Sequence, residues 1–186
     1  MASRSRPHPG NLATTQSNLS DKDQAFLDLL IHDYPQFRFC LNQKRFSFRF
    51  ANPPAKSTIF VGPPQPYFTL QTLHELGHAL CGHQDYHTHI ERLKIESAAW
   101  QRAKTVLENY RSKAKSLQQS SNPSVKLSGK NLAKILPTWN QDYAEDSLDT
   151  YRDWLHAKSK CKKCGQTCYQ TRDGKYHCPF CDTFCG

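Results

Sequence analysis

The segment His74-Glu75-Leu76-Gly77-His78 contains the residue types that metal-assisted hydrolysis requires. Two histidines four residues apart project from the same face of a helix, so both imidazoles can reach one metal ion. A zinc ion held there would polarise a scissile carbonyl and lower the pKa of a water, whose proton the intervening carboxylate can accept. We therefore predict that His74 and His78 are zinc ligands and that Glu75 is the general base.

The residues around this segment have the pattern of an amphipathic helix over residues 69–81, with Gly82 as its C-terminal cap. Small and apolar residues recur there at helical spacing: Leu73, Leu76, Gly77 and Leu80. One helix can then bury its leucines and present its histidines to a cleft. Gly77 is less favourable than Ala in a helix by about 1 kcal/mol, which predicts that a strand or the opposite helix packs closely there. This context favours a metal site over a chance match of five residues.

A third protein ligand is needed if the fourth position is to hold water. The longer HExxHxxGxxH pattern fails, because Cys81 and Gln84 occupy the positions of its Gly and its last His. Glu96 lies on the apolar stripe of the next helix, where a carboxylate is costly to bury unless it is paired or bound to metal, so it is the predicted third ligand. Alternative ligands remain nearby: His83, His87, His89 and Glu91. Three residues are candidates for stabilising the transition state: Tyr86, His87 and His89.

Two CxxC pairs, separated by thirteen residues, are spaced like the ligands of a zinc ribbon: Cys161, Cys164, Cys178 and Cys181. Residues 172–175 supply a hairpin turn between the pairs. Four thiolates leave no open position on the metal, so this second zinc would be structural. Cys168 and Cys185 repeat the same offset after each pair, so a different ligand set, a disulfide or an iron–sulfur cluster remains open.

The rest of the chain predicts an α+β fold with a small sheet. Residues 37–41 and 45–50 alternate between apolar and polar side chains, which predicts an antiparallel hairpin. Residues 57–61 predict a third strand, expected at the edge of the sheet near the cleft, where a substrate peptide could add to it.

Further helices are indicated by their start signals. Ser20 is a predicted N-cap, and Thr88 with Glu91 has the form of a capping box. The expected helices cover residues 20–33, 88–113 and 142–158. Residues 116–124 are expected to be a linker or exposed loop, and residues 131–136 a single helical turn.

At 186 residues, 37% of them hydrophobic, the chain can form one compact domain and a small module. The expected division is a tail over residues 1–19, a metallopeptidase domain over 20–158 and the zinc ribbon over 159–186. No stretch has about 18 uninterrupted apolar residues, and no apolar signal segment follows the first residues. We therefore expect a cytoplasmic protein without a membrane partner.

Charge and cysteine usage add two expectations. The formal charge is +9, but the basic residues are spread along the chain, which favours an ordinary solvated surface. Binding of nucleic acid through the basic surface and the ribbon remains open. Cys40 and Cys81 lie in apolar surroundings and are expected to be buried thiols in a reducing compartment.

The segment from His74 to Leu80, together with Glu96-Ser97-Ala98-Ala99-Trp100, resembles the minimal gluzincins, particularly the ImmA/IrrE-like metallopeptidases, which usually have Ala in place of Ser97. The resemblance implies a small strand layer against two zinc-binding helices, and hydrolysis of peptide bonds in a protein substrate that is often regulatory.

Two other hypotheses come from the combination of an HExxH segment with a zinc ribbon. The combination also resembles the SprT-like proteases that act on DNA-bound proteins, although their downstream Gly-His segment is missing here. A nonenzymatic adaptor for nucleic acid or protein is a different hypothesis. Glu75 argues against it, because a purely structural site would not need that carboxylate.

Overall fold

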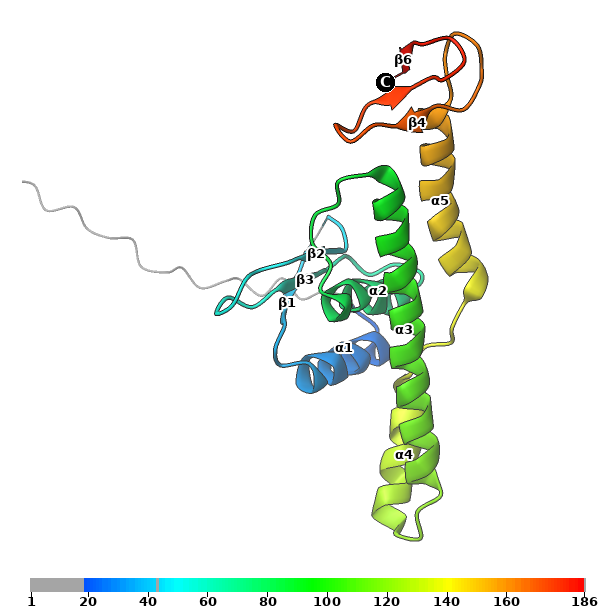
Figure 1. Ribbon diagram of the computed structural model, residues 1–186. Coiled ribbons are helices and arrows are strands. Elements are labelled where there is room, and N and C mark those ends of the chain that lie inside the picture. Colours follow the sequence, from blue (N-terminus) through cyan, green and yellow to red (C-terminus); the bar gives the residue numbers. More distant parts are fainter. Residues whose placement is uncertain (1–18, 43, 186) are drawn as a thin grey trace, which may run out of the picture.

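The computed structural model describes residues 19–42 and 44–185 and combines helices with two small sheets, which confirms the predicted α+β class (Figure 1). The elements in chain order are α1 (Asp21–Asp33), β1 (Arg38–Leu41), β2 (Ser47–Arg49), β3 (Thr58–Val61), α2 (Phe68–Cys81), α3 (His89–Gln118), α4 (Pro123–Ile135), α5 (Gln141–Ser159), β4 (Tyr169–Gln170), β5 (Tyr176–His177) and β6 (Phe184–Cys185). The predicted tail lies outside the described residues except for Leu19, which packs against the core. No helix in the described part of the chain is long and apolar enough to cross a membrane.

The first sheet has the strand order β1-β3-β2, so the predicted hairpin of residues 37–41 and 45–50 is wrong. The third strand lies between the other two: β1 pairs with β3 in parallel, and β2 pairs with β3 antiparallel. The prediction that residues 57–61 form an edge strand is wrong for the same reason. Ile59 and Val61 are 0% and 1% exposed, and the centre of the sheet is where such side chains can be buried most completely. The alternation of apolar and polar residues indicated that β1 and β2 are strands. It does not determine which strand each of them pairs with.

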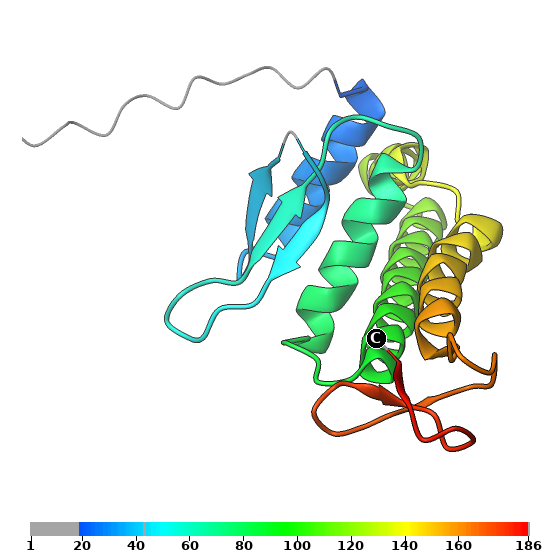
Figure 2. The ribbon, with the colours of Figure 1, turned by 90° about the horizontal axis from the view of Figure 1, so that it is seen from above.

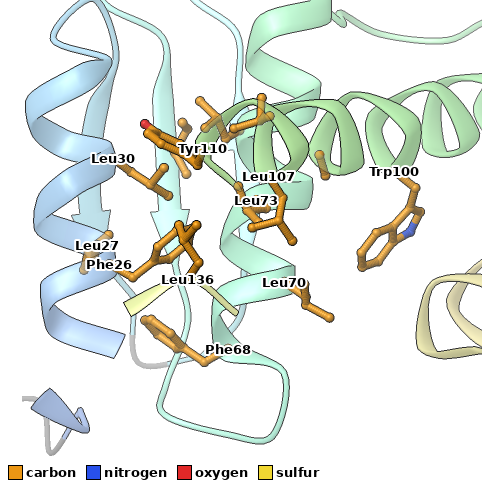
Figure 3. Close-up of a cluster of buried hydrophobic side chains, with 14 of the residues drawn as sticks. Phe26, Leu27, Leu30, Phe68, Leu70, Leu73, Trp100, Leu107, Tyr110 and Leu136 are labelled. Atoms are coloured by element: carbon orange, nitrogen blue, oxygen red, sulfur yellow. The ribbon is translucent and has the colours of Figure 1, made fainter. Parts of the chain in front are cut away.

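The main core lies between the sheet and the long helices. Figure 2 shows the sheet, α2, α3 and α5 following one another as layers, with α1 against the sheet. Phe26 and Leu30 of α1 point toward Leu73 of α2 and Leu107 of α3, all of them buried (Figure 3). Burying such side chains supplies most of the stabilisation that holds α2 in place.

Helix α3 continues to Gln118 and α4 begins at Pro123, so the predicted linker or loop over residues 116–124 is confirmed only at residues 119–122, and the residues on either side are helical. The side chain of Asn122 caps α4 by accepting hydrogen bonds from the backbone nitrogens of Ser124 and Val125. Gly129 lies where an added Cβ would be 2.8 Å from the carbonyl oxygen of Ala114, so α4 packs closely on α3. The polar composition that suggested a linker belongs to the exposed face of this helical hairpin.

Other local predictions are confirmed. Ser20 caps α1, Thr88 and Glu91 form the capping box of α3, and Gly82 ends α2 with a φ of 65°. Helix α5 spans nearly the expected range and packs on α3. Cys81, however, is exposed, which contradicts the prediction of a buried thiol, and Cys40 is half-buried.

Residues 160–185 form the C-terminal module, which lies between the end of α5 and the start of α3 (Figure 1). Its three-stranded antiparallel sheet has the order β4-β5-β6, and the turn predicted at residues 172–175 joins the first two strands. The module has a small core of its own made of Cys161, Cys168, Tyr176 and Cys178.

Candidate metal centre

Helix α2 presents His74 and His78 on the side that faces α3, while Leu73 and Leu76 are 0% exposed on its core side. The helices touch at Gly77, where an added Cβ would lie only 2.2 Å from the carbonyl oxygen of Ala99. This contact confirms the predicted close packing by the opposite helix. It also brings the residues one turn before Ala99 next to the two histidines.

Glu96 is one of those residues, and it forms a triangle with the two histidines. Nε2 of His74 lies 3.1 Å from Oε2 of Glu96 and 3.1 Å from Nε2 of His78, and the last pair, Nε2 of His78 and Oε2 of Glu96, is 3.4 Å apart. The three residues are 8–9% exposed. These atoms could hold one metal ion. Sequence reasoning had selected the same three residues.

The triangle is electrostatically coupled. Burial alone would raise the pKa of the Glu96 carboxyl, but hydrogen bonds with His74 and His78 outweigh burial and hold that pKa well below its usual range. Burial lowers the pKa of His74, which favours the neutral imidazole. An ionised carboxylate beside a neutral imidazole is the protonation state in which these groups act as ligands.

Neighbouring rings fix the orientation of the two imidazoles. Trp100 stacks on His74 with ring centroids 4.4 Å apart. Nδ1 of His83 lies 2.9 Å from Nδ1 of His78, on the side of that ring opposite Nε2. His83, one of the alternative ligands, therefore contacts a member of the triangle instead of belonging to it. Contacts of this kind orient ligands and set their basicity.

The other alternative ligands also lie outside the triangle. Glu91 accepts hydrogen bonds from the backbone nitrogens of His87 and Thr88 and belongs to the capping box. His89 contacts the C-terminal module through Gln170 and Tyr176.

Glu75 is half-buried and lies where two hollows of the surface meet. One hollow, of about 760 Å³, lies between β2, the loop after α2, and α3; the other, of about 460 Å³, extends toward Gln71 and Trp100. Both are lined by His74, Glu75 and Tyr151, so the two hollows adjoin at these residues, and we call them together the groove. Burial raises the pKa of Glu75 to about 7, and the nearby Glu96 carboxylate raises it as well.

The edge of the groove opposite α3 is strand β2, an edge strand whose residues Ser47, Phe48 and Arg49 all line the larger hollow. Arginines are prominent in this hollow: Arg45, Arg49 and Arg92. The guanidinium of Arg92 lies over the rings of Tyr86, Tyr151 and Trp154, at 5.3, 4.9 and 5.5 Å from their centroids. Stacking on three rings holds this cation in place within the groove.

Tyr151 of α5 is a site residue that sequence reasoning missed. It lines both hollows, the larger one together with Glu96 and Arg92, and the guanidinium of Arg92 lies over its ring. Burial raises its pKa, and the Glu96 carboxylate raises it further, so the hydroxyl keeps its proton. Its position on the apolar stripe of a helix suggested a core residue. Only the packing of α5 on α3 brings it to the groove. Of the residues expected to stabilise a transition state, Tyr86 lines the larger hollow.

The second candidate centre consists of the four predicted cysteines, Cys161, Cys164, Cys178 and Cys181, whose sulfurs could hold a metal ion. Sγ of Cys161 lies 3.6 Å from that of Cys181, and Sγ of Cys164 lies 3.5 Å from that of Cys178. Cys168 is buried in the core of the module, outside this group. The side chain of Cys185 is outside what the structure describes, so the alternatives that involve it remain untested.

Comparison with known proteins found no similarity. No family model matches the chain, and neither a curated protein nor a solved structure matches it. A functional assignment must therefore depend on the geometry of the two candidate metal centres and the groove.

Proposed function

We propose that the protein is a zinc-dependent metallopeptidase. The observation that carries the proposal is the buried triangle of His74, His78 and Glu96 with Glu75 beside it in an open groove. In a tetrahedral zinc site with bonds of about 2.0–2.1 Å, neighbouring ligand atoms are about 3.3 Å apart. The distances of 3.1–3.4 Å in the triangle agree with that value. Three protein ligands leave a fourth position open, as catalysis requires.

Zinc in this triangle would supply a Lewis acid for the carbonyl and lower the pKa of a water. Glu75 would accept the proton of that water and pass it to the leaving amine. Burial raises the pKa of this carboxyl to about 7 in the metal-free chain, and a raised pKa suits a carboxylate that must accept a proton from water. Tyr151 lines the groove and would offer its hydroxyl to the reacting carbonyl.

The substrate would be an extended peptide segment. Strand β2 pairs on one side with β3 and borders the groove on the other, so a peptide added to it gains main-chain hydrogen bonds while passing Glu75. The arginines of the larger hollow favour acidic side chains in the substrate. A cytosolic, regulatory protein is the kind of substrate that the resemblance to ImmA/IrrE-like peptidases implies.

The four cysteines would hold a second, structural zinc. With zinc–sulfur bonds of about 2.3 Å, sulfurs in a tetrahedral site are about 3.8 Å apart, close to the 3.5 and 3.6 Å measured here. Four thiolates leave no open position. Thiolate ligands persist in a reducing compartment, so we assign the protein to the cytoplasm.

The proposal is tested with Glu75→Gln in the full chain. A peptide library digested from a proteome is incubated with zinc-loaded protein, and new ends are counted by mass spectrometry. The parent chain should cleave and Glu75→Gln should not, while zinc content is the same in both, because the amide keeps the shape but cannot accept the proton. Absence of cleavage by the zinc-loaded parent, or retained cleavage by the variant, would contradict the proposal.

A further inference from the structure

The sheet of the C-terminal module has two faces with different surroundings. Tyr169 is the cross-strand partner of His177, and His177 of Phe184, so these three side chains share one face. Gln170 and Tyr176 are paired on the other face. The module lies at the start of α3, and which face meets that helix decides which face is open (Figure 1).

The face of Gln170 and Tyr176 is the covered one. Oε1 of Gln170 accepts a hydrogen bond from the backbone nitrogen of His89, at 2.9 Å. The hydroxyl of Tyr176 lies 2.7 Å from Nδ1 of the same histidine, and Tyr176 is only 4% exposed. His89 also packs on Trp154 of α5. The opposite face of the sheet is therefore turned away from the helices.

That open face carries a row of aromatic rings. The ring of His177 lies between Tyr169 and Phe184, with centroids 5.4 and 4.9 Å away. Tyr169 is 53% exposed and Phe184 is 65% exposed. Large apolar rings gathered on one open face mark a binding surface more often than scattered ones do. We name Tyr169, His177 and Phe184 the aromatic row.

Most of the charged side chains in the C-terminal module and at the end of α5 are positive. From residue 158 onward the chain has six basic side chains, all exposed: Lys158, Lys160, Lys162, Lys163, Arg172 and Lys175. The same stretch has two acidic residues, and both have partners within the module. Asp173 pairs with Lys175 at 3.1 Å, and Asp182 pairs with His177 at 2.9 Å. The exposed charges of the module are therefore mainly cationic.

We propose that the aromatic row binds single-stranded nucleic acid. Exposed rings on a module with many exposed cations fit a strand whose bases stack on the rings while its phosphates meet the lysines. A duplex hides its base faces, so it cannot use the rings. An acidic peptide could pair with the lysines but would gain little from Tyr169 and Phe184. This binding is independent of the proposed peptidase activity, since the row lies outside the groove.

The experiment measures binding to the zinc-loaded full chain by the fluorescence anisotropy of labelled probes. The probes are oligothymidylate and oligouridylate of about 16 nucleotides, a duplex of the same length and an acidic peptide. Tyr169→Ala and Phe184→Ala should each weaken single-strand binding by about 5- to 150-fold, the loss expected for one stacked base. Tyr169→Phe and Phe184→Tyr are matched controls that keep the ring, and they should bind like the parent. A preference for the uridylate would identify RNA as the ligand, and a preference for the thymidylate would identify DNA.

A second pair of variants separates stacking from charge. Lys162→Gln and Lys163→Gln should weaken binding of all strands alike and reduce its dependence on salt between about 50 and 200 mM. Zinc content and melting temperature of every variant should match the parent, because all four side chains are exposed. The proposal is overturned by a parent chain that binds no single strand, by equal affinity for the duplex, by tighter binding of the peptide, or by unchanged affinity in both alanine variants.

Discussion

The two candidate metal centres differ in how their ligands are supplied and in what surrounds them. His74, His78 and Glu96 come from two helices that meet at one close backbone contact, and a groove opens beside them. The four cysteines come from one short module, and two of them, Cys161 and Cys178, are almost fully buried. With a tetrahedral ion bound, the first centre would leave a position open near a carboxylate, and the second would leave none. The same kind of ion would thus support chemistry in one place and folding in the other.

The largest expected effect is the loss of one metal ion without the other. Glu96→Ala removes one of three ligands, so zinc content should fall from about two ions per chain to about one, measured by elemental analysis. Glu91→Ala is the matched control on the same helix. It removes a capping interaction that stabilises by about 0.5–2 kcal/mol and should leave both ions bound. Full zinc content in Glu96→Ala would remove Glu96 from the site.

The converse variant is Cys164→Ser. It should empty the four-cysteine site while the triangle keeps its ion, and the module should lose ordered structure, because metal binding there contributes directly to folding. Cys81→Ser replaces an equally exposed cysteine and should change neither. Zinc content reports the loss of the ion. Near-ultraviolet circular dichroism, to which the module's tyrosines contribute, reports the loss of ordered structure. Loss of both ions from Cys164→Ser would show that the two centres are not independent.

An intermediate effect is expected at Tyr151. Tyr151→Phe keeps the ring beneath Arg92 but removes the hydroxyl that interacts electrostatically with Glu96. Loss of such a supporting contact typically lowers metal affinity or activity by about 10- to 100-fold. The control is Tyr143→Phe, which removes a hydroxyl that is hydrogen-bonded to Gln71. Zinc titration together with peptide cleavage would show which of the two properties changes, and parent-like values in both would limit Tyr151 to packing.

The smallest effect concerns the contact that brings the two ligand helices together. Gly77→Ala would place a Cβ 2.2 Å from the carbonyl oxygen of Ala99, so α2 and α3 must separate. Overpacking of this kind typically destabilises by about 1–3 kcal/mol, more than the gain in helix propensity of about 1 kcal/mol. At Gly82 an added Cβ meets nothing within 4 Å, so Gly82→Ala tests backbone strain alone. Melting temperatures and zinc affinities of the two variants would separate these causes, and only Gly77→Ala should weaken zinc binding.

The residues that gather at both centres could be predicted from local sequence. A spacing of four residues on a helix fixes where His74 and His78 point, and two CxxC pairs on a hairpin fix four sulfurs. Glu96 was found because a carboxylate on a buried stripe needs a partner. The helix caps could be predicted for the same reason, because the residues that make a cap are neighbours in the chain.

The sequence alone did not determine the contacts between elements that are far apart in the chain. Alternation identified β1 and β2 as strands, but only the burial of Ile59 and Val61 placed β3 between them and made β2 the edge beside the groove. Tyr151 lines the same hollow as Glu96, 55 positions earlier in the chain, because α5 packs along α3, and no short-range pattern encodes that packing. Likewise, the aromatic row becomes an open surface only because the other face of its sheet meets His89. Local spacing decides which groups can share an ion, whereas tertiary packing decides which side chains surround it and which remain open to a partner.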